Sequence, residues 1–212
     1  MASRMIHYVI AKQIASDLNI KDVNAFCIGA MVADSFKIRS KSPKARSHFF
    51  DEVGDQRYIN YLRFQEKYLK DELDDFCLGY FLHLYMDAIN WKKIIIDIVF
   101  PYQNGDREEN VKLFYEDNHR WNTHLRKKYD LSFDLTPLNK FNVEEVDIED
   151  QQAFLDLFKE DFEDIEDDGY VLFTKEMFES FMEEYYQKGL DILKVVMSFK
   201  TCDDGTQYLV RG

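Results

Sequence analysis

Proline and glycine are scarce in this chain, and long apolar runs are missing. The 212 residues include only three prolines and eight glycines. Because these residues most often interrupt regular structure, their scarcity favours long helices over many short strands. No apolar stretch reaches the length of about 18 residues that spans a bilayer, so we expect no transmembrane segment. The N-terminal segment, MASRMIHYVIAKQIASDL, also lacks the continuous apolar core and the cleavage signal of a signal peptide.

Basic residues and cysteines are also few in this chain. The chain has 27 Lys and Arg against 40 Asp and Glu, which gives a net charge of −13. This balance argues against a surface for long nucleic acids, which need basic stripes, and against simple adhesion to anionic membranes. It does suit a protein that holds divalent cations. The three cysteines, Cys27, Cys77 and Cys202, have no metal or redox spacing, and their odd number fits a reducing cytosol, so we expect a cytoplasmic protein.

What the chain has in quantity is apolar and aromatic side chains. Hydrophobic residues make up 46% and aromatic residues 16% of the chain, which is enough for a sizeable core. The length suits one domain, and we assign residues 1–200 to a single all-helical domain and residues 201–212 to a C-terminal tail with no clear pattern. Residue spacing and capping residues predict helices over 4–18, 22–34, 55–69, 107–129 and 174–198, with a loop over 35–54. A further long helix is expected to begin at Asp74 or Asp75 and to end before Pro101. The acidic segment 143–168 is interpreted as a solvated helical face with a loop, since the regular spacing of a calcium loop is missing.

The segment GYFLHLYMDAINW, residues 79–91, is almost wholly apolar except for His83 and Asp87. In a helix these two side chains lie on one face, about 5–6 Å apart at Cβ, so they can bind one metal ion together. A buried pair without partners would be costly. The plainer alternative is a neutral core histidine that is hydrogen-bonded to one aspartate.

Three more polar residues stand in similar surroundings. His7 lies beside an aliphatic stripe, Asp34 ends the apolar run FCIGAMVAD, and His48 is flanked by aromatics in SHFF. Each has an ordinary alternative: His7 as a packing residue, Asp34 as a loop residue and His48 as a stacked loop residue. Jointly they favour a metal site, because imidazole suits zinc and a carboxylate can bridge two ions.

The ordered series of His7, GAMVAD with Asp34, SHF with His48, and GYFLHLYMD with His83 and Asp87 resembles the zinc-dependent phospholipase C family. The resemblance is strongest over residues 6–91. It implies the all-helical fold that this family shares with P1-type nucleases, in which the metal site lies between helices. It also implies that Asp34, His48, His83 and Asp87 hold one zinc ion, and that Asp87 bridges to a second ion bound by His7.

Two departures from the family pattern shape the expected site. The family completes its second metal position with a free N-terminus, whereas here Met1 lies six residues before His7, so we expect Asp117, or its neighbour Glu116, to substitute. The family's third zinc needs a histidine ten residues after His83 and then an HxxxE pair. Position 93 is Lys93, and neither His119 nor His124 is followed by the required glutamate. We therefore expect two Zn²⁺ ions, with Mn²⁺ or Fe²⁺ as alternatives.

The expected activity is that of a metal-dependent phosphoesterase. Two ions suit attack of water at phosphorus, and Asp34 is the candidate catalytic residue, which would orient or deprotonate the water. The expected substrate is a small phosphoester or a phospholipid-derived molecule. A metal-binding helical protein without turnover is the first alternative, and a helical interaction module that binds no metal is the second. The substrate and the oligomeric state stay open.

Overall fold

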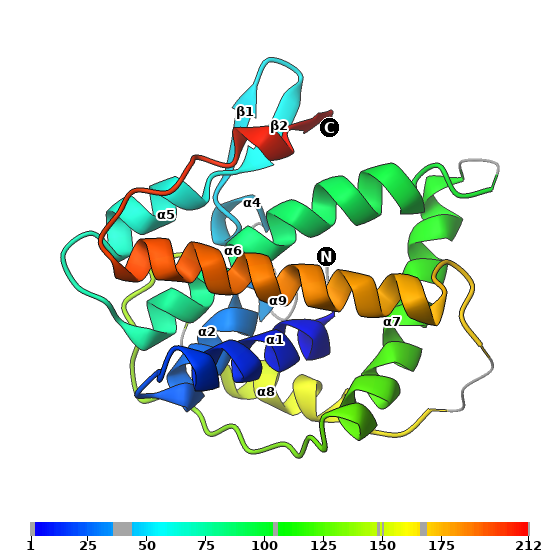
Figure 1. Cartoon of the computed structure of the whole chain (residues 1–212), viewed down its shortest axis with the longest axis horizontal. Helices are drawn as coiled ribbons and strands as arrows, with labels where there is room; N and C mark the ends of the chain where they lie inside the picture. The colour runs from blue at the N-terminus through cyan, green and yellow to red at the C-terminus, as the bar shows by residue number, and fades with distance from the viewer. Residues whose placement is uncertain are drawn as a thin grey trace.

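The structure is a computed structural model that describes residues 3–35, 44–103, 106–147, 149, 151–165 and 169–211. It is mostly helical, in agreement with the predicted all-α class (Figure 1). In chain order the elements are α1 (Arg4–Asp17), α2 (Val23–Val32), η1 (Ala33–Ser35), α4 (Lys44–Ser47), β1 (Phe50–Val53), β2 (Gln56–Ile59), α5 (Tyr61–Tyr68), α6 (Asp75–Asn90), η2 (Trp91–Val99), α7 (Arg107–Lys128), α8 (Gln151–Glu160), α9 (Lys175–Met197), η4 (Thr206–Tyr208) and β3 (Val210–Arg211).

Six of the described helices begin where the sequence supplies a capping side chain. Such a residue accepts a hydrogen bond from a backbone N–H of the first turn, which would otherwise lack a partner. The capping residues of α1, α2, α5, α6, α7 and α9 are Ser3, Asp22, Asn60, Asp74, Asp106 and Thr174. The predicted starts at Asp22, Asp74 and Thr174 are confirmed.

A β-hairpin replaces part of one predicted helix and part of one predicted loop. Residues 50–53 and 56–59 pair as antiparallel strands around a two-residue turn, in which Gly54 takes a φ of 64°. Two-residue hairpin turns need such positive φ angles, and glycine adopts them without strain. The prediction of a helix over 55–69 is therefore wrong in its first part, and α5 begins only at Tyr61.

The C-terminal residues are tied to the hairpin and to α5. Val210 pairs with Arg57, which makes β3 the third strand of the sheet in the order β1-β2-β3. Gln65 donates a hydrogen bond to the carbonyl oxygen of Lys200 and accepts one from the backbone N–H of Cys202. Figure 1 shows this strand beside the hairpin at one end of the molecule.

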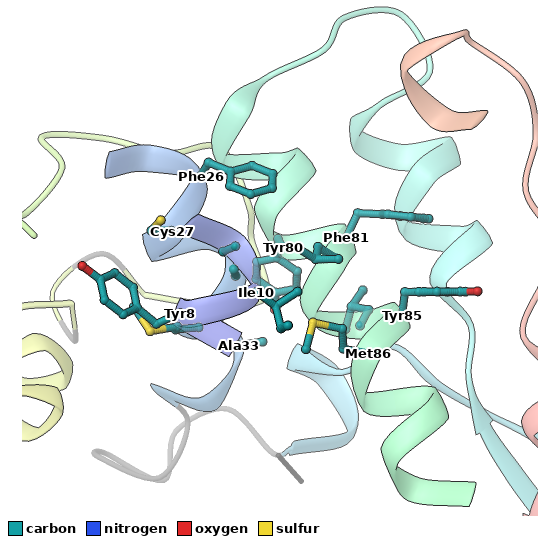
Figure 2. Packing of buried hydrophobic residues seen from close by; sticks show 14 of the residues in the cluster. Tyr8, Ile10, Phe26, Cys27, Ala33, Tyr80, Phe81, Tyr85 and Met86 are labelled. Carbon is teal, nitrogen blue, oxygen red and sulfur yellow. The ribbon is translucent and has the colours of Figure 1, made fainter. Parts of the chain in front are cut away.

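Helices α1, α2 and α6 share one core. Tyr8 and Ile10 from α1, Phe26 and Cys27 from α2, and Phe81 from α6 contribute buried side chains to it (Figure 2). Helix α9 packs against α1 and α6 from the other side. Within the described residues, no helix has the length and apolar character needed to cross a membrane.

Two glycines bring α2 and α6 unusually close. A Cβ atom added at Gly29 would lie 2.1 Å from the carbonyl oxygen of Phe76, and one added at Gly79 would lie 2.0 Å from that of Phe26. Only residues without a side chain fit at this crossing, since real Cβ atoms almost never approach other atoms within 3.0 Å. The crossing sets the position of α6 relative to the end of α2, where the candidate site begins.

Candidate functional site

Five of the six predicted ligand residues meet in the interior of the protein. His7 lies on α1, Asp34 in η1, His48 just after α4, and His83 and Asp87 on α6. The three histidines are fully buried, and the two aspartates are 6% and 2% exposed. Side chains from four separate segments thus form one polar cluster, which we call the His/Asp cluster.

The carboxylate of Asp87 lies at the centre of the cluster. Its Oδ1 is 3.4 Å from His7 Nε2, whereas its Oδ2 is 3.4 Å from His48 Nε2 and 3.8 Å from His83 Nε2. On the far side of His48, Asp34 Oδ1 lies 3.5 Å from the same Nε2 atom. The two oxygens of Asp87 therefore face different imidazoles, which is the arrangement that a bridging carboxylate requires.

Hydrogen bonds outside the cluster determine which ring nitrogens carry protons. His83 Nδ1 is 2.9 Å from the carbonyl oxygen of Ala30, which can only accept, so Nδ1 is the protonated nitrogen. His48 Nδ1 is 2.9 Å from Ser47 Oγ, and Ser47 Oγ in turn donates to the carbonyl oxygen of Lys44. Because that hydroxyl proton is already used, His48 Nδ1 is the donor to Ser47. Carbonyl and hydroxyl partners of this kind orient metal-binding histidines.

With Nδ1 as the protonated nitrogen, the Nε2 lone pairs of the two rings face each other. His48 Nε2 and His83 Nε2 are only 3.3 Å apart, and with both Nδ1 atoms protonated neither Nε2 has a hydrogen to donate. The repulsion is relieved only when a cation, either a proton or a metal ion, lies between them. The hydrogen-bonding pattern of this position therefore suits a cation.

Other polar atoms of the cluster lack partners. His7 Nδ1, His7 Nε2, Asp34 Oδ1 and Asp87 Oδ1 are buried without a hydrogen bond. The ring of His7 stacks on that of His83 with centroids 4.2 Å apart and an angle of 21° between the planes. An unsatisfied buried polar group costs about 1–3 kcal/mol, so a native protein rarely keeps several together without a ligand.

The electrostatics of the cluster favour ionised carboxylates beside a neutral His83. Burial alone would raise the pKa of Asp34, but the adjacent imidazoles of His48 and His83 hold that pKa well below its usual range. Burial would also raise the pKa of Asp87, but the adjacent His48 and His7 hold it well below its usual value. Burial, together with the neighbouring His7, lowers the pKa of His83 to about 3. At neutral pH both carboxylates are therefore ionised and His83 is neutral.

Three distances between the polar atoms match a tetrahedral metal ion, whereas that from His83 Nε2 to Asp87 Oδ2, 3.8 Å, is slightly longer. Ligands bound at about 2.0–2.2 Å in a tetrahedron lie about 3.3–3.6 Å apart. The distances from His48 Nε2 to His83 Nε2, Asp87 Oδ2 and Asp34 Oδ1 are 3.3, 3.4 and 3.5 Å. The second group, formed by His7, His83 and Asp87, also converges closely enough to hold an ion. The cluster can therefore bind metal, through two groups that share His83.

The helix framework explains why these side chains meet. The glycine crossing of α2 and α6 brings the Ala30 carbonyl to His83. Tyr80, one turn before His83 on α6, donates a hydrogen bond of 2.6 Å to the carbonyl oxygen of Ser47. This contact anchors the residue before His48 against α6, so both histidines are positioned from the same helix.

Asp117, the sixth predicted ligand, belongs to a different arrangement. It is fully buried on α7, but its carboxylate accepts hydrogen bonds from the backbone N–H groups of Val171 and Leu172 and from Arg120. The structure does not bring it into the His/Asp cluster. Its physical role is to hold the segment that leads into α9, so the expectation that it completes the second metal position is corrected. Its competitor Glu116, which is half-buried, is not part of the cluster either.

The remaining polar candidates lie outside the cluster. Lys93 is paired with Glu184. His119 is exposed, and His124 Nε2 lies 3.1 Å from Glu179 Oε1. These placements agree with the expectation that both histidines are surface or rim residues. The expectation concerning the chain terminus falls on residues 1 and 2, which lie outside the described part of the chain.

Two asparagines beside the cluster were missed by the sequence analysis. Asn90 follows Asp87 by three residues on α6, and its Oδ1 accepts a hydrogen bond of 2.9 Å from Tyr185 on α9. Its Nδ2 and that of Asn118 are buried without partners, and both residues line a cavity of about 20 Å³ together with Ile6. The sequence spacing could have identified Asn90, because it continues the polar face of His83 and Asp87 by one more turn of the helix.

Comparisons of the chain with protein-family models, with curated proteins and with solved structures find no match.

Proposed function

We propose that this protein is a metal-dependent phosphoesterase of the phospholipase C/P1 nuclease type, which uses two ions held by the His/Asp cluster. The observation that carries the proposal is the position of Asp87. Its two oxygens lie 3.4 Å from His7 Nε2 and 3.4 Å from His48 Nε2. Zn²⁺ suits this mixture of imidazole and carboxylate, and Mn²⁺ and Fe²⁺ are the competing ions.

Metal ions bound in such a pair lower the pKa of water and neutralise charge on phosphoryl oxygens. The protein's own groups would then orient the reactants. Asp34 Oδ1 is buried without a hydrogen bond, so it is available to accept one from the attacking water. Because His48 and His83 keep the pKa of Asp34 low, this carboxylate is a weak base. Its role is to orient the water rather than to retain the proton.

The substrate that fits the charge balance is a small phosphoester, including phospholipid-derived molecules. The net charge of −13 opposes long nucleic acids. The residues of the cluster are at most 6% exposed, which leaves little room for a bulky group at the metal position itself.

The same burial supports a second candidate, a metal-binding helical protein without turnover. A structural metal site is closed by protein ligands, whereas a catalytic one keeps a position open for water or substrate. The two candidates make the same prediction for bound metal and opposite predictions for hydrolysis.

The decisive experiment measures bound metal and hydrolysis of a phosphoester panel for the wild type and two matched variants, Asp87→Asn and Asp117→Asn. Both replacements remove one buried carboxylate charge without changing side-chain size. We expect about two ions per chain in the wild type. Since loss of a mere supporting partner costs about 10–100-fold, Asp87→Asn should reduce metal content below one ion and kcat/KM by more than about 100-fold.

Asp117→Asn is the control for general damage to the fold. It should retain the metal and lose thermal stability instead, because Asp117 holds the segment before α9. Less than one ion per chain in the wild type would refute the dinuclear site. Stoichiometric metal without hydrolysis of any phosphoester would favour the metal-binding protein without turnover.

A further inference from the structure

Arg57 on β2 lies between two aromatic rings next to the His/Asp cluster. Its guanidinium carbon is 5.2 Å from the ring centroid of Phe50 and 5.1 Å from that of Trp91. Contacts of this kind hold a cation in place through the negative faces of the rings. The side chain is therefore fixed in direction, although β2 belongs to a small sheet at the edge of the molecule.

Both rings connect Arg57 to the cluster. Phe50 follows His48 by two residues, and their rings stack with centroids 6.2 Å apart and an angle of 16° between the planes. Trp91 follows Asp87 by four residues, which places it about one turn, or 6 Å, further along the same helix face. One aromatic ring, that of Phe50, thus separates the guanidinium group of Arg57 from His48, and the other ring belongs to a residue about one helix turn after Asp87.

The donors at this position have no acceptor. Arg57 Nε and Trp91 Nε1 are both buried, and neither has a hydrogen-bond partner. Each can only donate, so what they lack is an oxygen atom with lone pairs. A second cation, Lys44, has its Nζ 5.7 Å from the Trp91 centroid, and it adds positive charge to the same corner.

An arginine without a carboxylate is unexpected in so acidic a chain. Arg4, Arg63 and Arg126 each form an ion pair with an aspartate. Across the described part of the chain, Arg57 forms none, although acidic residues outnumber basic ones by 40 to 27. The planar guanidinium group matches phosphate and carboxylate groups geometrically, so the missing partner has the chemistry of an oxyanion.

We propose that Arg57, held between Phe50 and Trp91, binds a second oxyanion group of the substrate, about one helix turn from the phosphate that reacts. This inference rests on the proposed function, and it narrows the substrate class to phosphoesters with two separate anionic groups, such as a bisphosphate. Trp91 Nε1 and Arg57 Nε supply the hydrogen bonds, and the metal position receives the other phosphate. A zwitterionic phosphodiester such as a choline ester would place a cation against Arg57 and is a poor substrate.

The test compares two substrates that differ only in the second anion, propyl phosphate and propane-1,3-diol bisphosphate, with metal-loaded wild type, Arg57→Gln and Arg57→Lys. A charge-assisted hydrogen bond is worth about 10- to 100-fold in binding. We expect the wild type to prefer the bisphosphate by about this factor in kcat/KM. Arg57→Gln should abolish the preference while the rate with propyl phosphate stays within about threefold, and Arg57→Lys should retain part of the preference because it keeps the charge.

Two kinetic results would overturn the inference. One is a wild type that shows no preference for the bisphosphate. The other is an Arg57→Gln variant that loses activity equally with both substrates, because such a loss would mean that Arg57 only supports the fold.

Equilibrium binding separates this inference from the proposed function. Calorimetry of propane-1,3-diol bisphosphate with metal-loaded wild type and Arg57→Gln needs no turnover. A wild type that hydrolyses neither substrate, yet binds the bisphosphate at least about 10-fold more tightly than Arg57→Gln does, would support the oxyanion site and refute the phosphoesterase proposal. Equal binding by the two proteins, or no binding by the wild type, would overturn the oxyanion site.

Discussion

Replacing Gly79 by alanine tests whether the crossing of α2 and α6 controls the metal site. The new Cβ atom would lie 2.0 Å from the carbonyl oxygen of Phe26 and 2.9 Å from the backbone nitrogen of Ala30. Both neighbours are backbone atoms, which cannot rotate away. Since Cβ atoms almost never approach closer than 3.0 Å, the two helices must separate by about 1 Å, the difference between 3.0 and 2.0 Å.

The cost to stability follows from two opposing effects. Overpacking against rigid backbone atoms should destabilise the fold by about 3 kcal/mol, the upper end of the usual range for overpacking. Replacing glycine by alanine inside a helix returns about 1 kcal/mol. The net loss in the free energy of unfolding is about 2 kcal/mol, which for a chain of this length lowers Tm by about 4–8 °C.

The same separation of the helices should also weaken metal binding. The hydrogen bond between His83 Nδ1 and the Ala30 carbonyl oxygen is 2.9 Å long, and a separation of about 1 Å would break it. Without that partner His83 loses its fixed tautomer and orientation, and metal affinity should fall by about 10- to 100-fold. Competition with a chromogenic chelator measures this directly.

Gly189→Ala on α9 is the matched control. Its new Cβ would meet only the ends of two flexible side chains, at 2.8 and 3.0 Å, so those side chains can adjust. We expect a Tm within about 4 °C of the wild type and unchanged metal affinity. A Gly79→Ala protein with the stability and the metal affinity of the wild type would show that the crossing does not position His83.

Four further predictions can be checked with purified protein. Removing metal with a chelator should lower Tm by about 8–16 °C, because a ligand at 1,000 times its Kd stabilises the fold by about 4 kcal/mol; an unchanged Tm would mean that no metal is bound. In the metal-free protein, burial lowers the pKa of His83 to about 3, whereas the unfolded chain takes up the proton near pH 6.5. Between these values the unfolded state holds more protons, so this contribution to stability is complete above about pH 6.5 and is lost progressively toward pH 3, and a Tm that stays flat from pH 7.5 to 5 would contradict it. Burial raises the pKa of Cys27 and of Cys202 to about 12, so a thiol reagent at pH 8 should label none of the three thiols in the native state and all three in denaturant. Trp121 is stacked between two aromatic rings at 3.8 and 3.9 Å, and Trp121→Ala should cost about 3–5 kcal/mol with no change in the number of bound ions, since the ring lies outside the His/Asp cluster.

Most of the cluster could be predicted because of where its polar residues stand in the sequence. His83 and Asp87 interrupt an apolar helix, and a helix that is apolar on every side is buried. Its polar side chains must then find partners inside the protein. The same reasoning applied to His7, Asp34 and His48, and the structure brings all five together.

The reasoning was wrong for Asp117 because burial alone does not identify the partner. Asp117 is as buried as the histidines of the cluster, but its oxygens bind backbone N–H groups more than 50 residues further along the chain. Nothing in the local pattern of α7 reveals that contact. Arg57 was missed for a related reason, since the hairpin was interpreted as part of a helix and its side-chain directions were therefore wrong.

The glycine crossing also has a consequence for folding during synthesis. The five cluster residues, the glycines that join α2 to α6 and the carbonyl that orients His83 all lie before residue 88. When Asp87 is added to the growing chain, α7 and α9 have still to be synthesised. A metal ion captured at that stage would hold three helices together before α7 and α9 exist to cover them, so the supply of metal during synthesis would set the yield of folded protein.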